Sequence, residues 1–222
     1  MKVLIGYSTS TETLEAFARL GHDAWTCDLL PAEHKNHLQC DIWEVANDSW
    51  DLGIFHPMCT YLTVSAAWAF SDPNYERYPG VGYHQRIKPE TIVGAERRAL
   101  REAEIENFKR LDTLPYPHTI ENPGSNFVST FYRKPNQIIQ PYEFGDDASK
   151  STGLWLRGLK PLKIDPLKRC PGRIVNYRGK QVERWSNQTD SGQNKLSPSK
   201  DRWLQRSKTY PGIARAFAEA WG

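Results

Sequence analysis

The sequence predicts an α/β fold in which a mostly parallel sheet is flanked by helices. Short apolar runs, such as residues 3–5 and 51–55, are bounded by turn-forming or charged residues, as is typical of strands buried on both faces. Segments with helical patterns separate these runs, which indicates right-handed crossovers between parallel strands. The 222 residues suffice for one domain with an appendage, and 39% hydrophobic with 25% charged residues is a globular balance.

Strands and helices alternate in the first half of the chain. Residues 3–5 form the first predicted strand, and Thr9 or Thr11 caps a helix that continues to Leu20 and is closed by Gly21. The next predicted elements are a strand over 24–27, an apolar patch at Leu38, a short helix over 43–46 and the strand over 51–55.

The second half begins with a long segment without periodicity. Residues 71–91 are rich in Pro, Gly and Tyr, which predicts a loop, and long loops in compact domains often cover binding sites. The remaining predicted elements are a helix over 92–111, a strand over 118–120 stopped by turn residues, an antiparallel edge over 137–140 and 153–156, an irregular segment over 165–205 and a helix over 211–221.

Residues 150–206 form a small basic segment in a chain whose formal net charge is +3. Basic residues interleaved with aromatic residues suit a phosphate backbone and stacked bases. On composition alone, a solvated basic surface remains an equally open interpretation. The residues that we expect to contact nucleic acid are Lys160, Lys163, Arg169 and Trp155.

Composition and spacing argue against membrane and metal functions. No apolar stretch approaches the ~20 residues that span a bilayer, and the N-terminal apolar run is too short for a signal peptide, so we expect a cytoplasmic protein with no membrane partner. His34 and His37 are three residues apart without a further ligand nearby, and we expect no metal. Neither zinc-ligand spacing nor a disulfide framework is found among the four cysteines, which are Cys27, Cys40, Cys59 and Cys170.

A thiol and a carboxylate follow two predicted parallel strands. Cys59 comes shortly after the strand over 51–55, and Glu121 comes directly after the strand over 118–120. Ligands of open α/β sheets bind outside the carboxyl ends of the strands, so we expect both side chains to act on one substrate. His56 is a candidate base or activator of Cys59. The alternatives are a buried hydrophobic Cys, a Glu that bonds turn amides and a structural His.

The N-terminal strand, turn and helix have the layout of a nucleoside-cofactor site. Gly6, Tyr7 and Ser8 form the turn, and an acid about 20 residues later, Asp28, is placed to take ribose hydroxyls. Asp41 is placed to accept from an adenine amino group. The alternative interpretation of Asp28 is a helix cap.

The order of these residues resembles that of the cytosine-C5 DNA methyltransferases, and more closely that of the small methyltransferase-like proteins encoded by phages and prophages. The resemblance covers most of the chain but includes no large target-recognition domain. The matching segments are 3–17 for the cofactor loop, 27–28 for the ribose acid, 40–41 for the adenine contact, 56–60 for the Pro-Cys loop, 121–123 for Glu-Asn-Val, 133–141 for the Gln/Arg strand and 210–221 for the C-terminal helix.

The resemblance implies a Rossmann-like methyltransferase fold with S-adenosylmethionine as the cofactor and DNA or a nucleotide as the substrate. Residues 1–149 would form the catalytic domain, 150–206 a reduced recognition segment and 207–222 a helix that packs back on the cofactor domain. The location would be the host cytoplasm if the protein is phage-encoded.

The resemblance also assigns roles to individual residues. Cys59 is the thiolate that adds to cytosine C6, and Glu121 hydrogen-bonds N3 and N4 of the base. Arg133 supports the base or a phosphate, Asn122 contacts the substrate, and Pro57 lies at the cofactor. In duplex DNA the target base is first flipped out of the stack.

Two departures from the family pattern keep other functions open. Met58 stands where the family has a proline, and residues 8–11 stand where it has a glycine-containing turn. One alternative is a nucleotide-binding protein without methyl transfer, acting as a phage factor against host defence. Another is a different Cys-dependent enzyme that acts on a nucleotide base. The sequence does not predict an oligomeric state.

Overall fold

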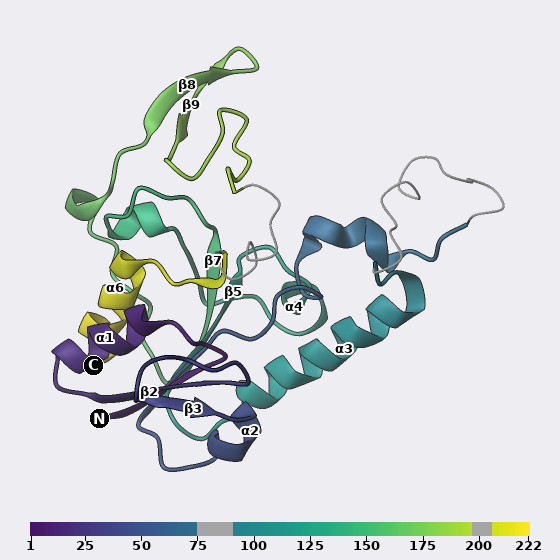
Figure 1. The fold of residues 1–222 in the computed structure, drawn as a ribbon. Helices are drawn as coiled ribbons and strands as arrows, with labels where there is room; N and C mark the ends of the chain where they lie inside the picture. Colours follow the sequence, from purple (N-terminus) through teal and green to yellow (C-terminus); the bar gives the residue numbers. More distant parts are fainter. Residues whose placement is uncertain (75–90, 197–205) are drawn as a thin grey trace.

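The computed structural model describes residues 1–74, 91–196 and 206–222 (Figure 1). The strands are β1 (Lys2–Gly6), β2 (Asp23–Asp28), β3 (His37–Gln39), β4 (Leu52–Phe55), β5 (His118–Pro123), β6 (Gln137–Ile139), β7 (Thr152–Arg157), β8 (Arg173–Tyr177) and β9 (Lys180–Arg184). The α-helices are α1 (Thr11–Arg19), α2 (Ile42–Val45), α3 (Gly94–Leu111), α4 (Val128–Phe131) and α6 (Pro211–Trp221). The 3₁₀ helices are η1 (Val64–Phe70), η3 (Pro141–Phe144) and η4 (Pro166–Lys168).

A seven-stranded sheet in the order β3-β2-β1-β4-β5-β7-β6 confirms the predicted α/β class. All neighbouring pairs from β3 to β5 are parallel, whereas β7 is antiparallel to both β5 and β6. The chain moves outward from β1 through β2 to β3, then returns to place β4 on the other side of β1. The carboxyl ends of β1 and β4 therefore meet at a topological switch point, where open α/β sheets bind their ligands.

Alternate residues of the central strands face opposite sides of the sheet. Val3 and Ile5 of β1 pack with Phe17 of α1 and Phe217 of α6 in one core cluster. Leu4 packs with residues of α3 in a second cluster on the other face. Helices α1 and α6 thus cover one face of the sheet and α3 covers the other (Figure 1).

The first and last helices run side by side in the same direction. α6 packs against α1, and a Cβ added to Gly222, just after α6, would lie 2.7 Å from Nε2 of His22, just after α1. Because the carboxyl ends of the two helices are neighbours, their amino ends are neighbours too. The segments that precede α1 and α6 therefore meet at the switch-point edge of the sheet.

Two predicted boundaries differ from the structure. β5 continues through Pro123, so Glu121 lies inside a strand that pairs with β7 instead of in a turn. α1 begins at Thr11 after Ser10, and neither Thr9 nor Thr11 is its N-cap. The predicted loop over 71–91 lies mostly outside the described residues, which omit 75–90.

The antiparallel strands predicted over 137–140 and 153–156 are β6 and β7 of the main sheet. Residues 165–205, which were predicted to be irregular, contain two further strands. β8 and β9 form an antiparallel hairpin that projects from the body of the protein (Figure 1). Its two-residue turn is Arg178-Gly179, in which both φ angles are positive, at 51° and 74°. Residues 197–205 of this segment lie outside the described residues.

In the described ranges, no helix combines the length and the apolar character that crossing a bilayer requires.

Candidate functional site

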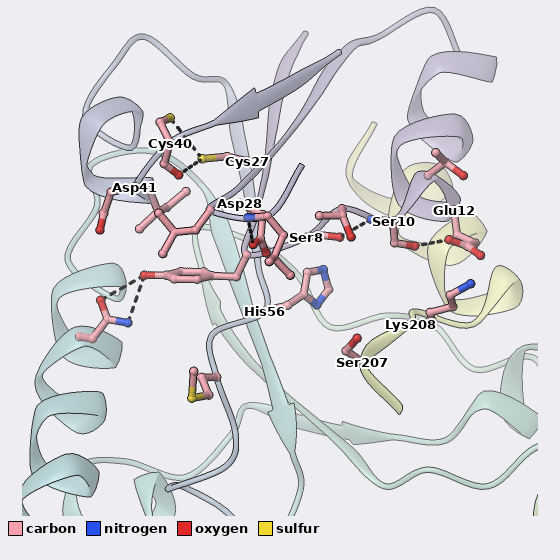
Figure 2. Close-up of a pocket in the computed structure, with 18 of the residues that line it drawn as sticks. Ser8, Ser10, Glu12, Cys27, Asp28, Cys40, Asp41, His56, Ser207 and Lys208 are labelled. Carbon is pink, nitrogen blue, oxygen red and sulfur yellow. Dashed lines mark hydrogen bonds between the residues drawn. The ribbon is translucent and has the colours of Figure 1, made fainter. Parts of the chain in front are cut away.

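A cavity of about 780 Å³ opens at the switch point of the sheet (Figure 2). Its walls come from the turn between β1 and α1, the residues that follow β2, β3 and β4, one side of α3 and the segment before α6. Its lining includes Tyr7, Ser8, Ser10, Glu12, Cys27, Asp28, Cys40, Asp41, His56, Met58, Glu104, Asn107, Ser207 and Lys208.

Two predicted cofactor residues, Asp28 and Asp41, line this cavity. Asp28 Oδ1 accepts from the backbone N–H of Leu30 at 2.9 Å, which fixes the turn after β2. Asp41 caps α2, and its Oδ1 accepts from the N–H of Trp43 at 2.8 Å. In each residue one carboxylate oxygen holds the local turn, so the local fold positions the carboxylate at the edge of the cavity.

Tyr7 also lines the cavity, with a backbone in the left-handed region at φ 58°. Its hydroxyl donates to Oδ1 of Asn107 at 3.2 Å, and Trp43 Nε1 donates to the same oxygen at 3.1 Å. Burial raises the pKa of Tyr7 and that of Glu104, one turn before Asn107. The tyrosine therefore presents a neutral aromatic ring to the cavity.

Sequence reasoning missed the lining residues that α3 contributes. Glu104 and Asn107 are three residues apart, so they share one face of α3. The spacing indicates that the two side chains lie on the same face of the helix, but only the tertiary fold shows that this face reaches the cavity. For the segment before α6, the resemblance implies that 207–222 packs back on the cofactor domain, but Ser207 and Lys208 were not singled out as lining residues.

Gly6 and Pro57, two other predicted cofactor residues, are not among the lining residues. A Cβ added to Gly6 would lie 2.6 Å from Phe55, so the strand packing requires glycine there. The carbonyl of Pro57 accepts from Asn122 Nδ2 at 3.0 Å. Asn122, predicted to contact substrate, is buried and ties the end of β5 to the loop after β4.

His56, Glu121 and Lys150 form a charged cluster beside the cavity. His56 Nδ1 lies 3.2 Å from Glu121 Oε2, and Lys150 Nζ lies 3.6 Å from Oε1. Burial alone would raise the pKa of Glu121, but the charges of Lys150 and His56 outweigh it and lower the pKa to about 2. Both Oε2 of Glu121 and Nε2 of His56 are buried, and neither has a hydrogen bond of standard geometry to the residues that the structure describes.

Cys59 is exposed, four residues beyond the end of β4. Its carbonyl accepts from the N–H groups of Leu62 and Thr63 at 3.0 and 2.9 Å, which places the cysteine at the start of a tight turn. Neither Cys59 nor Glu121 lines the cavity, whereas their respective neighbours Met58 and His56 both do. The cavity lining therefore includes a neighbour of each predicted catalytic group, but neither group itself.

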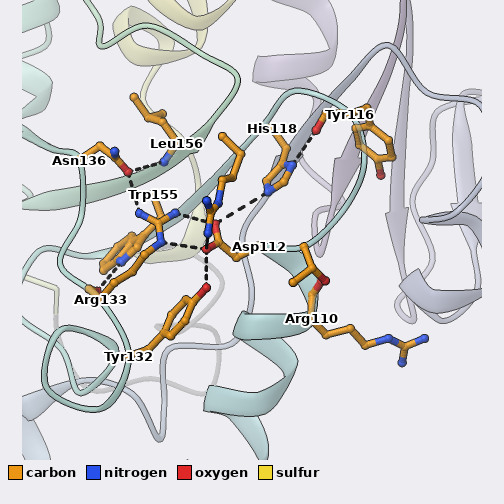
Figure 3. A network of polar contacts seen from close by, with 11 residues as sticks. Arg110, Asp112, Tyr116, His118, Tyr132, Arg133, Asn136, Trp155 and Leu156 are labelled. Atoms are coloured by element: carbon orange, nitrogen blue, oxygen red, sulfur yellow. Dashed lines mark hydrogen bonds and ion pairs between the residues drawn. The ribbon is translucent and has the colours of Figure 1, made fainter.

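Arg133, predicted to support the base, is instead part of a network around Asp112 (Figure 3). Its Nε donates to Asp112 Oδ2 at 2.8 Å and its Nη2 to Oδ1 at 2.5 Å. Burial would raise the pKa of Asp112, but hydrogen bonds from Arg133, Arg157 and Tyr132 lower it to about 2. Arg133 is therefore engaged within the fold.

Trp155 lies in the same region, at the centre of β7 (Figure 3). Its side chain is 0% exposed, and its Nε1 donates to the carbonyl of Arg133 at 2.8 Å. An indole buried in this way is not accessible to a base, in contrast to the expectation from sequence.

The three basic residues singled out in the sequence are all exposed. Arg169 is paired with Glu183, with Nη1 3.0 Å from Oε1, and lies over the stacked rings of Tyr142 and Trp185. Lys160 and Lys163 lie between β7 and η4. Further exposed cations, Arg178 and Lys180, lie at the turn of the β8–β9 hairpin.

Within the described part of the chain, no three His, Cys, Asp or Glu side chains are grouped to hold a metal ion. Cys27 and Cys40 are free thiols whose sulfur atoms lie 3.8 Å apart in the cavity wall. Comparison with protein-family models gives no match, and comparison with curated proteins gives no significant match either.

Proposed function

We propose that this protein is an S-adenosylmethionine-dependent methyltransferase that acts on cytosine C5 in DNA or in a nucleotide. The observation that carries the proposal is the cavity at the switch point, with Asp28 and Asp41 in its wall. Its volume of about 780 Å³ is in the usual range for a small-molecule or cofactor site. In this proposal Asp28 binds the ribose hydroxyls and Asp41 the adenine amino group.

The charges of the lining favour a nucleoside without phosphates. Four acidic residues, Asp28, Asp41, Glu104 and Glu12, line the cavity, and Lys208 is the one lysine or arginine among the described lining residues. Sites that hold phosphates gather cations and backbone N–H groups around the anion. An acidic lining would repel a nucleoside di- or triphosphate, whereas S-adenosylmethionine carries no phosphate.

The sheet topology also supports the proposal. Rossmann-like methyltransferases have a seven-stranded sheet in which the last strand of the sequence is reversed and inserted next to the edge. Here β7 is antiparallel and lies between β5 and β6. The position of the cavity relative to the strands agrees with this fold class.

In the proposed reaction, the Cys59 thiolate adds to cytosine C6 and makes C5 nucleophilic. Bound S-adenosylmethionine supplies the methyl group. Glu121, kept ionised by Lys150 and His56, accepts a hydrogen bond from the exocyclic amino group. A base then takes the C5 proton, and Cys59 leaves as the thiolate. His56 lies between Glu121 and the cavity and is the candidate base.

The proposal includes nucleic acid as a partner through the β8–β9 hairpin. A two-stranded ribbon fits the major groove of B-DNA. Arg178 and Lys180 lie exposed at the turn of the hairpin, and Ile174 is 63% exposed on β8. Phosphate contacts from these cations would supply most of the affinity, since so small an element makes few base contacts.

The alternative of a nucleotide-binding protein without methyl transfer is favoured by two observations. Tyr7 takes a left-handed backbone conformation, which glycine adopts more readily, in the cofactor turn. Arg133 is engaged with Asp112 and does not face the predicted base site. A third possibility, a Cys59-dependent enzyme of another kind, would retain the cysteine chemistry without the cofactor.

Two measurements test the proposed function. Titration calorimetry with S-adenosylmethionine should give saturable binding, and absence of binding would reject methyl transfer. Oligonucleotides that contain 5-fluorocytosine should then form a covalent complex in the presence of the cofactor, because fluorine cannot leave as a proton. Cys59→Ser should abolish this complex while retaining cofactor binding. Cofactor binding with no adduct and no methyl transfer would favour the binding protein.

A further inference from the structure

We infer that Cys27 and Cys40 are a reversible redox site in the cavity wall, and that a disulfide between them weakens binding of the ligand in the cavity. The reagent that oxidises the pair is a small-molecule disulfide, of which oxidised glutathione is an example. The effect on the ligand rests on the proposed function, because it concerns the same cavity. Formation of the disulfide does not rest on it.

The two thiols are in direct contact (Figure 2). Their sulfur atoms lie 3.8 Å apart, and Cys27 Sγ donates to the backbone carbonyl of Cys40 at 3.6 Å. Cys27 pairs with Leu38 in the parallel register of β2 and β3, and Leu38 and Cys40 both pack against the core cluster that contains Cys27. Because a disulfide bond measures about 2.0 Å, a local movement is enough to bring the two sulfur atoms to bonding distance.

The two cysteines differ in exposure. Both line the cavity, but Cys27 is 0% exposed whereas Cys40 is half-buried. Burial, reinforced by the contact with Cys40, raises the pKa of Cys27 to about 12, so this group is a protonated thiol at neutral pH. The thiolate is the nucleophile in disulfide exchange. Cys40 is therefore the group that reacts first with a reagent in the cavity.

The exchange transfers two electrons from the pair to the reagent. The Cys40 thiolate attacks one sulfur of the small disulfide, which forms a mixed disulfide and releases one thiolate. The Cys27 thiol then loses its proton and attacks Cys40 Sγ, which forms the bond between the two cysteines and releases the second thiolate. The two released thiolates take up the protons that the cysteines lose, so the reagent leaves as two thiols. The contact of 3.8 Å places Cys27 for the second attack.

Each cysteine directly precedes a predicted nucleoside-binding residue. Asp28 follows Cys27 at the end of β2, and Asp41 follows Cys40 and caps α2. β3 is a three-residue strand at the outer edge of the sheet, so the segment before Cys40 has a neighbouring strand on one side only. Formation of the disulfide brings Cys40 closer to β2, and Asp41 moves with it. The carboxylate that the proposed function assigns to the adenine amino group is then displaced, which weakens binding.

Mass spectrometry tests formation of the disulfide without any ligand. Cys59→Ser combined with Cys170→Ser leaves the pair as the only two cysteines of the chain. Incubation of this variant with oxidised glutathione should remove both free thiols together, lower the mass by two hydrogen atoms and leave no glutathione attached. Dithiothreitol should restore both thiols. If both thiols stay free, or if glutathione stays attached to Cys40 while Cys27 stays free, the inference is wrong.

Calorimetry with S-adenosylmethionine measures the effect on the cavity. The oxidised variant should bind about tenfold more weakly than the reduced one, or more weakly still, because a charged hydrogen bond is lost. By linkage, saturating S-adenosylmethionine should lower the equilibrium constant for disulfide formation by the same factor. Cys40→Ser in the same background is the matched control, since it cannot form the disulfide. Its affinity should be equal before and after treatment with oxidised glutathione.

The two measurements separate this inference from the proposed function. Equal affinity of the oxidised and reduced variants would overturn the effect on the ligand. If Cys40→Ser loses affinity on treatment as its parent does, the effect does not come from the pair and the inference is wrong. If the reduced protein does not bind S-adenosylmethionine, the proposed function is rejected, and mass spectrometry alone decides whether the redox site exists.

Discussion

His56 Nδ1 lies 3.2 Å from Glu121 Oε2 because β4 and β5 are parallel neighbours in register. Phe55 pairs with Ile120, so the next residue of each strand comes to the same position along the sheet edge. The register therefore brings His56, and not the more distant Cys59, beside the buried carboxylate. His56 is therefore the side chain after β4 that contacts this carboxylate.

The acid stability of the protein should depend on Glu121. Its folded pKa of about 2 lies below its ordinary value of 4.5, so the ionised form stabilises the fold above about pH 4.5. This contribution is lost as the pH falls from about 4.5 through about 2. Glu121→Gln should lower stability at pH 7 by about 3 kcal/mol. Urea unfolding at several pH values measures the difference from wild type, which should shrink below pH 4.

The pH at which this loss of stability begins should depend on Lys150. Its charge is the largest influence that lowers the pKa of Glu121. Lys150→Met should therefore raise that pKa and move the loss of stability to higher pH, whereas Lys150→Arg should behave as wild type. Unchanged acid unfolding of Lys150→Met would show that His56 alone keeps Glu121 ionised.

Arg133 should matter for stability and not for cofactor binding. It forms two hydrogen bonds to the buried carboxylate of Asp112, and removal of one partner leaves that charge less compensated. Arg133→Ala should cost about 3 kcal/mol of unfolding free energy with unchanged affinity for S-adenosylmethionine. The neighbouring exposed Lys134→Ala is the control. If Arg133→Ala has the same unfolding free energy as wild type, the structural role is wrong and a role of Arg133 in substrate binding is favoured.

Strands buried on both faces were predictable because they are continuous apolar runs. β5 was predicted too short because Glu121, Asn122 and Pro123 have the composition of a turn. Asn122 instead donates to the Pro57 carbonyl, while charges from other segments compensate Glu121. Such compensation comes from residues distant in sequence, so local pattern does not show it.

The β8–β9 hairpin was missed for a local reason. Its turn places Arg178 in the left-handed region, where Asn, Asp or Gly is the usual signal, although Gly179 follows it. In the cavity, Asp28 and Asp41 were predictable because each directly follows a strand or short apolar patch. Lys208 and Asn107 reach the cavity only through the packing of α6 and α3, which brings together residues that are distant in sequence.

Asp28 should contribute to cofactor affinity through its charge. Asp28→Asn retains the side-chain oxygen that accepts from Leu30, so the turn after β2 should stay intact. Loss of a charged hydrogen bond to the ribose should weaken S-adenosylmethionine binding by about tenfold to a hundredfold. Calorimetry measures the affinity, and thermal unfolding without ligand checks the turn. An affinity equal to wild type would place the ribose elsewhere.

The affinity for nucleic acid should depend on salt concentration because cations at the hairpin turn contact phosphates. Each neutralised phosphate contributes a slope of about −0.9 in log affinity against log salt on duplex DNA, and about −0.7 on single strands. Arg178→Asn combined with Lys180→Gln removes two exposed cations, and Asn tolerates the left-handed backbone of residue 178. Fluorescence anisotropy with a labelled duplex should show a slope shallower by about 1.8.

Arg169→Gln should change that slope less, because Glu183 already neutralises Arg169. This contrast separates a specific role of the hairpin turn from a general effect of net charge. If all these variants retain the wild-type slope, the phosphate contacts lie elsewhere, and Lys160 and Lys163 become the next residues to replace. If wild type fails to bind either a duplex or a single strand at low salt with S-adenosylmethionine present, nucleic acid is not the partner. A free nucleotide is then the substrate to test, since the cavity and Glu121 make no use of the hairpin.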